Sequence, residues 1–254
     1  MSKTHIVIPD PHAHYEHNNQ RAIWLGNLIN DVKPDVVIQL GDSADMPSLS
    51  GFEKGRASFH GRTYRADVNA HLEFNDKLWS IVKRQKKRLP YRVALEGNHE
   101  HRIVKALDIQ PELEGTISLD DLEMSSFYDD FILYQGNTPG VIQIDGIFYA
   151  HYMVSGVMGR AISGEHPAYS LLSKQHASCT VGHTHITDYA IRTLPNGNRI
   201  HGLVAGVFQD YDSPWAGECN KLWWRGCIIK RNVHEGSYDP QFVSLDYLRR
   251  EYGS

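Results

Sequence analysis

Five short blocks of the chain carry side chains that could hold metal ions. Carboxylate, imidazole and amide groups together suit borderline divalent ions such as manganese, iron, zinc or cobalt. No cysteine belongs to the blocks, which argues against a structural zinc site. One block alone would indicate a turn, a helix cap or an ordinary buried histidine, so the evidence lies in their joint occurrence. In chain order the blocks are Asp10-Pro-His12, Gly41-Asp42-Ser-Ala-Asp45, Gly97-Asn98-His99-Glu100, His151 and Gly182-His183-Thr-His185.

Each block follows a short apolar run that we interpret as a β-strand. In an α/β fold, the ends of several strands bring together side chains that are far apart in the sequence. A helix expected over residues 18–32 joins the first two runs into a βαβ unit with a parallel strand pair. The five runs occupy residues 5–9, 36–40, 92–96, 147–150 and 179–181.

The rest of the chain divides into an α/β first half and a strand-rich second half. Because both halves supply ligands to one site, we expect two packed sheets flanked by helices in a single domain, residues 1–254. Residues 46–66 are expected to form an active-site loop, and the acidic segment 108–130 is a candidate cap. Further helices are expected over 67–88, 100–107 and 164–176, and further strands over 131–134, 141–144, 189–194, 199–207 and 222–230.

Composition places few limits on the partners. A hydrophobic content of 41% and a charged content of 22% are ordinary for a globular protein, and a formal net charge of −4 gives no global sign of nucleic-acid binding. No apolar run has the length of a membrane span and the first residues lack a signal-peptide core, so we expect no membrane partner. The odd count of three cysteines fits a reducing, cytoplasmic location. The oligomeric state stays open.

The five blocks resemble the motifs of the calcineurin-like metallophosphoesterase superfamily. That family's pattern is D-x-H, G-D-x-x-D, G-N-H-D/E, a later His and G-H-x-H, and the chain matches every block between residues 10 and 185. The resemblance implies an α/β fold, specifically a four-layer αββα sandwich of two mixed β-sheets flanked by helices. It also implies two divalent metal ions, for which we favour manganese, with iron, zinc, cobalt and nickel as alternatives.

The resemblance further implies how the ligands divide between the two ions, with the Asp42 carboxylate shared. The first ion would take Asp10, His12, Asp42 and His185. The second would take Asp42, Asn98, His151 and His183. A hydroxide bridging two such ions would attack phosphorus in line with the leaving group.

The family pattern also implies two catalytic residues that do not bind metal. His99 is expected to donate a proton to the leaving alkoxide. Asp45 is expected to hydrogen-bond to His99 and to fix its tautomer. The alternative for Asp45 is a helix N-cap after the preceding strand.

The substrate is less well defined by the sequence. Protein Ser/Thr phosphatases carry Asp-Arg-Gly where this chain has Asp45-Met46-Pro47, and an Arg where it has Leu95-Glu96, which argues against that class. Loop 46–66 interleaves aromatic and basic residues, a combination that suits stacking on bases and pairing with phosphates.

We therefore expect Arg56, Arg62 and Arg102 to contact the substrate. The alternatives are a surface loop whose aromatic residues pack on the body of the protein, and a solvated helix position for Arg102. The expected function is hydrolysis of a phosphodiester of nucleic acid or a nucleotide. A phosphomonoesterase acting on nucleotides or other small molecules is the alternative, and a non-catalytic scaffold of the same fold is a third possibility.

Overall fold

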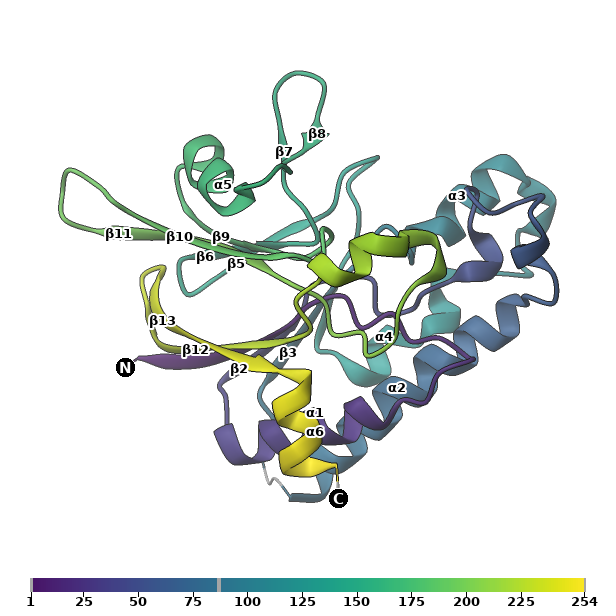
Figure 1. Ribbon diagram of the computed structural model, residues 1–254, viewed down its shortest axis with the longest axis horizontal. Coiled ribbons are helices and arrows are strands. Elements are labelled where there is room, and N and C mark those ends of the chain that lie inside the picture. The colour runs from purple at the N-terminus through teal and green to yellow at the C-terminus, as the bar shows by residue number, and fades with distance from the viewer. Residues whose placement is uncertain (1, 86–87, 254) are drawn as a thin grey trace.

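The computed structural model describes residues 2–85 and 88–253, which form two β-sheets stacked face to face between layers of helices (Figure 1). Helices α1 (Gln20–Val32), α2 (Tyr64–Gln85) and α6 (Leu245–Tyr252) cover the first sheet, and α5 (Pro167–Gln175) covers the second. The α/β sandwich of two mixed sheets expected from the sequence is confirmed.

The first sheet has six strands in the order β13-β12-β1-β2-β3-β4. Strands β1 to β4 run parallel to one another, whereas β12 and β13 join in the antiparallel sense. The strands are β1 (Lys3–Ile8), β2 (Val36–Gln39), β3 (Tyr91–Leu95), β4 (Asp130–Ile132), β12 (Gly226–His234) and β13 (Ser237–Ser244).

The second sheet has five strands in the order β10-β11-β9-β6-β5. Its three central strands are parallel, and both edge strands are antiparallel to their neighbours. The strands are β5 (Val141–Ile144), β6 (Ile147–Ala150), β9 (Ser178–Val181), β10 (Thr187–Thr193) and β11 (Arg199–Ala205). A small hairpin of β7 (Val154–Ser155) and β8 (Arg160–Ala161) stands apart from both sheets.

Side chains of the buried strands alternate between the two faces of each sheet, and this alternation explains the layered architecture. In β1, Ile6 and Ile8 pack among the helices, whereas Val7 lies in the core between the two sheets. Successive side chains of a strand point to opposite faces, so a strand that is apolar at every position can serve two cores at once. The second sheet shares the middle core through residues such as Leu203 and contacts α5 through residues such as Val181.

Several predicted boundaries were wrong. Helix α2 begins at Tyr64 and takes three residues from the expected loop 46–66, which also contains the short helices η1 (Pro47–Leu49) and η2 (Ala57–Phe59). The end of the expected helix 67–88 includes residues 86–87, which lie outside the described residues. The strand expected over 222–230 starts only at Gly226, because Pro214–Leu222 forms the 3-10 helix η5, and β13 was not foreseen.

Residues 108–130, the candidate cap, contain several short helices. After α3 (His101–Ile109) come the short helices η3 (Pro111–Leu113), η4 (Leu119–Leu122) and α4 (Met124–Phe127). Leu122 and Met124 are buried in the same core as the side chains of α2. Apolar side chains at this spacing made the segment part of the helical layer. Among the helices in residues 2–85 and 88–253, none is both long and apolar enough to span a membrane.

Candidate metal centre

The ligand blocks meet at the carboxyl ends of five central strands. Asp10 and His12 follow β1, Asp42 follows β2, and Asn98 follows β3 in the first sheet, whereas His151 follows β6 and the His183/His185 block follows β9 in the second. In Figure 1 these strand ends lie together on the right of the two sheets. Strands that end at a common edge thus bring residues 10 and 185 into contact.

A first group of ligands gathers Asp10, His12, Asp42 and His185, all buried, with one ligand atom of each within 4.8 Å of the others. The Nε2 atoms of His12 and His185 are 3.1 Å apart, and His185 Nε2 lies 3.4 Å from Asp10 Oδ2. This group contains the same four residues that the resemblance implied for one ion.

A second group shares Asp42 and adds His151 and His183. The Nε2 atom of His151 lies 3.4 Å from Asp42 Oδ2, 2.8 Å from Asn98 Oδ1 and 3.2 Å from His183 Nδ1. Asn98 and His183 are half-buried, so this group faces solvent more than the first does. The two groups contain six of the seven expected ligands, and the seventh, Asn98, contacts His151 of the second group.

The arrangement of acceptor atoms fits divalent cations. His12 Nδ1 is 2.9 Å from Asp45 Oδ1 and His151 Nδ1 is 2.9 Å from the Leu40 carbonyl, so in each neutral ring Nδ1 carries the proton. Each Nε2 lone pair therefore points into the cluster, toward carboxylate oxygens and other ring nitrogens. Among the described residues, the buried Oδ1 of Asp10 also has no hydrogen-bond partner. Converging lone pairs repel one another unless a cation lies among them.

The electrostatics of the cluster also favour positive charge. Burial disfavours a charged His151, yet the Asp42 and Asp10 carboxylates outweigh it and raise its pKa to about 9. Burial raises the pKa of Asp10 to about 7, although His151 acts in the opposite sense. Burial and the neighbouring His151 lower the pKa of His183 to about 4. Burial is thus the largest cause of the pKa shifts of Asp10 and His183, whereas the neighbouring carboxylates raise the pKa of His151.

The candidate ligand residues adopt a left-handed backbone conformation that few residues other than glycine favour. Asp10, His12, Asp42, His183 and His185 all have positive φ, between 37° and 70°. Such residues persist where the surrounding structure holds them, and they cluster at functional sites.

Two positions of the motifs must be glycine because neighbouring atoms leave no room for a side chain, and not because the backbone has a positive φ angle there. A Cβ on Gly97 would lie 2.2 Å from both the Asp42 amide nitrogen and Asp42 Oδ1. A Cβ on Gly182 would lie 2.2 Å from Asp10 Oδ1. The ligand loops can approach one another only because these two positions lack a side chain.

Glu100 holds two of the ligand loops together, a role that the sequence did not indicate. Its carboxylate is fully buried and accepts hydrogen bonds from the amides of Asp42 (2.9 Å), Ala44 (2.8 Å) and Gly97 (2.8 Å). The expected helix 100–107 places Glu100 in its first turn, without a role at the site. Its place in the G-N-H-E block was a signal that could have identified it.

Arg21 holds the first ligand loop and was also not foreseen. The fully buried guanidinium donates to the carbonyls of Pro11 (2.8 Å) and Phe208 (3.0 Å) and pairs with Asp210 (3.0 Å). The Tyr211 hydroxyl donates to the His12 carbonyl (2.8 Å). An arginine inside an otherwise apolar helical pattern was the only sequence signal for this contact.

Asp45 contacts both His12 and His99. Its carboxylate accepts from His12 Nδ1 at 2.9 Å and lies 3.3 Å from His99 Nδ1, which is 2.6 Å from the Asp45 carbonyl. The alternative interpretation as a helix N-cap is wrong, because the next helix has Met46 at its N-cap and no side-chain cap. Asp45 therefore orients His12 through its side chain and His99 mainly through its backbone.

Arg102 lies against His99 instead of in solvent. It is half-buried, and its Nη1 donates to the carbonyls of Asp45 and Met46, while Nη2 donates to His99 Nε2 at 2.9 Å. The solvated helix position that we had considered is therefore wrong. Because Nε2 of His99 accepts this hydrogen bond, the predicted proton-donor role requires that atom to become protonated first.

The two loop arginines differ from each other. Arg62 forms two hydrogen bonds of 2.7 and 2.8 Å with Glu53 and lies over the Phe59 ring, so its charge is engaged within the loop. Arg56 is exposed. The side chain of Phe52 is 88% exposed, whereas Tyr64 packs against the helical core, so the alternative that the loop's aromatic residues pack on the body holds for Tyr64 and not for Phe52. Neither arginine makes a described contact with the ligand cluster.

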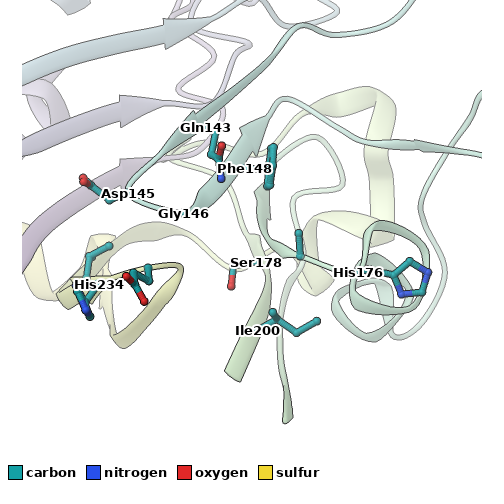
Figure 2. A pocket seen from close by; sticks show the side chains of 11 residues that line it. Gln143, Asp145, Gly146, Phe148, His176, Ser178, Ile200 and His234 are labelled. Atoms are coloured by element: carbon teal, nitrogen blue, oxygen red, sulfur yellow. The ribbon is translucent and has the colours of Figure 1, made fainter. Parts of the chain in front are cut away.

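A separate pocket lies beside the turn between β5 and β6 (Figure 2). It has a volume of about 590 Å³ and its lining includes Asp145, His176, Ser178 and His234. Ser178 begins β9 and His234 ends β12, so this pocket opens at the amino ends of the parallel strands. It is therefore distinct from the ligand cluster at their carboxyl ends.

No family model matches the chain. The chain is 28% identical over 204 residues to the gene 54 protein of Mycobacterium phage L5, a match that covers 78% of this chain and 74% of that protein. Among solved structures it is similar to the crystal structure of TT1561 of Thermus thermophilus at 10% identity and a TM-score of 0.38, over 95% of this chain and 99% of the other.

Proposed function

We propose that the chain is a metal-dependent phosphoesterase of the calcineurin-like type, with two divalent cations held around Asp42. The observation that carries this proposal is the convergence of seven ligand side chains into two groups that share one carboxylate. When bound, two such cations would supply Lewis acidity to a phosphoryl oxygen and lower the pKa of a water molecule. The first group would comprise Asp10, His12, Asp42 and His185, and the second Asp42, Asn98, His151 and His183.

Residues of the protein would orient the metal-binding side chains and donate a proton in this reaction. Asp45 keeps the proton of His12 on Nδ1, which leaves Nε2 free to bind. His99 faces the cluster with Nε2 3.9 Å from Asp42 Oδ2 and is the nearest candidate to give a proton to a leaving oxygen. Arg102 adds a fixed positive charge beside His99, where negative charge would develop on the phosphoryl group.

A phosphodiester of a nucleotide or nucleic acid is the substrate that we favour. The exposed Arg56 and Phe52 support this preference, because they offer charge and a ring surface in the loop that follows the Asp42 block. A monoester substrate is the alternative outcome of the test below.

The test is hydrolysis of bis-p-nitrophenyl phosphate and p-nitrophenyl phosphate with and without manganese, together with measurement of bound metal. We expect manganese-dependent release of p-nitrophenol from the diester and a loss of about 100-fold or more in Asp42→Asn. Asp76→Asn is the matched control, because Asp76 is exposed on the outer face of α2.

The outcomes separate the candidate functions. Turnover of the monoester alone would change the assignment to a phosphomonoesterase. Bound metal without turnover of either ester would support the non-catalytic scaffold, and equal activity of Asp42→Asn and the wild type would refute the metal mechanism.

A further inference from the structure

Two tryptophans lie beside the first ligand group, and the proposed mechanism does not use them. The Trp223 ring packs edge-on against the His185 ring with 4.4 Å between centroids. The backbone amide of Trp224 donates to the His185 carbonyl at 3.1 Å, which fixes this segment against the ligand loop. Trp223 is therefore held at the border of the metal centre.

Trp215 extends this aromatic surface outward. Its ring centroid is 5.8 Å from that of Trp223, and its side chain is 62% exposed. Both residues belong to the segment around η5, drawn yellow-green in Figure 1, which lies across the strand ends where the ligand blocks follow. An indole this exposed gains little from folding, because most of its apolar surface remains in water.

We propose that Trp215 and Trp223 form a stacking surface for a nucleobase of the substrate. This inference rests on the proposed phosphoesterase function and specifies a nucleoside phosphate ester as the substrate class. A phosphate held near His185 would have its organic substituent next to Trp223. Every nucleobase offers a π face, so an indole surface binds bases with little dependence on their identity.

The charges around the two tryptophans support stacking rather than ion pairing. Lys221 pairs with Glu218 at 2.5 Å, and Arg225 pairs with Asp212 at 2.5 Å. With these charges already paired, the surface offers a substrate mainly its indole faces. The contribution of the base to binding should therefore depend weakly on salt, unlike that of the phosphate.

The first experiment measures binding without turnover. The manganese-loaded protein is titrated with adenosine 5′-monophosphate or ribose 5-phosphate while tryptophan fluorescence is followed, and chromatography verifies that each ligand stays intact. We expect quenching by the nucleotide only, with affinity reduced about tenfold in Trp215→Leu. Tyr169→Leu is the matched control, because Tyr169 is similarly exposed but lies on α5.

The second experiment measures turnover of two diesters with the same leaving group. Thymidine 5′-(p-nitrophenyl phosphate) carries a base, whereas methyl p-nitrophenyl phosphate does not. We expect Trp215→Leu to lower kcat/KM about tenfold for the first ester and to leave the second unchanged. Trp215→Phe, which retains a ring, should keep most of the preference.

The two experiments separate failure of the stacking surface from failure of the phosphoesterase function. Equal binding of nucleotide and ribose phosphate, or a nucleotide affinity that is unchanged in Trp215→Leu, would overturn the stacking surface even if both esters are hydrolysed. Nucleotide binding that depends on Trp215, without turnover of any ester, would support the surface and count against the phosphoesterase.

Discussion

Two buried polar clusters lie between the same two sheets, and they differ in the balance of charge. The metal cluster at the carboxyl ends directs carboxylate oxygens and imidazole lone pairs toward one another. The lysine cluster, defined as His5, Tyr149, Thr180 and Lys230, lies further along the strands. Both clusters are buried, so burial alone does not distinguish a site from a structural network.

The lysine cluster contains its own hydrogen-bond donors. The fully buried Lys230 amine donates to Thr180 Oγ1 and lies 4.5 Å from the centre of the Tyr149 ring. His5 Nδ1 is 2.8 Å from the Tyr149 hydroxyl, and its Nε2 donates to Asp145 at 2.9 Å. Donors and acceptors match here, whereas acceptors are in excess in the metal cluster. The difference teaches that a buried cluster with an excess of converging acceptors could hold metal ions, whereas one with matched donors and acceptors has no need of them.

The largest expected effect compares one histidine from each cluster. We expect His151→Gln to weaken metal binding by about 100-fold or more, because it removes a ligand, and His5→Gln to leave the metal content unchanged. Metal content after dialysis against limiting manganese, measured by mass spectrometry, provides the readout. Loss of metal in both variants, or in neither, would show that the two clusters do not differ in metal binding.

A second prediction concerns the residue that joins two ligand loops. We expect Glu100→Ala to lower the free energy of unfolding by about 3 kcal/mol, because three buried amides lose their acceptor, and to weaken metal binding as well. Urea denaturation at pH 7.5 measures the first effect. Glu123→Ala is the control, because that carboxylate is exposed and makes no described side-chain contact. An unchanged midpoint would show that the loops hold their shape without Glu100.

A third prediction concerns pH. Burial, aided by the charge of Lys230, lowers the pKa of His5 to about 4. Below about pH 6.5 the imidazole of His5 takes up a proton in the unfolded chain, whereas in the folded protein it stays neutral down to about pH 4. The stability that the neutral His5 contributes is therefore fully present above about pH 6.5 and is lost as the pH falls toward about 4. We expect the wild type to lose up to about 3 kcal/mol more than His5→Gln over this range. Parallel stability curves from urea denaturation would exclude His5 as the cause.

The smallest expected effect concerns the lysine itself. Burial holds the pKa of Lys230 well below its usual range. We expect Lys230→Met to change the free energy of unfolding by less than about 1 kcal/mol, because an apolar residue of similar length can replace a buried charge. Thermal denaturation and metal analysis of this variant test the point. A loss of metal binding in Lys230→Met would mean that the two clusters are coupled.

Much of the fold could be predicted because its signals are local. The apolar runs identified β1, β2, β3, β6 and β9, since a strand buried on both faces is apolar at nearly every position. Boundaries were less reliable where a helix formed within a region rich in glycine and proline, as at Tyr64 and in η5. The short helices within 108–130 were not foreseen, because a short amphipathic pattern does not identify which surface it will cover.

The sequence by itself determined the ligand types, their order and their positions after strands, since these follow from side-chain chemistry and from the two-residue period of a strand. Only the tertiary structure decided which atoms meet. It brought Arg102 to His99, Glu100 to the amides of two loops and Trp223 to His185. The physical reason is that these contacts join parts of the chain whose separation in space depends on how the two sheets stack, and no local pattern encodes that packing.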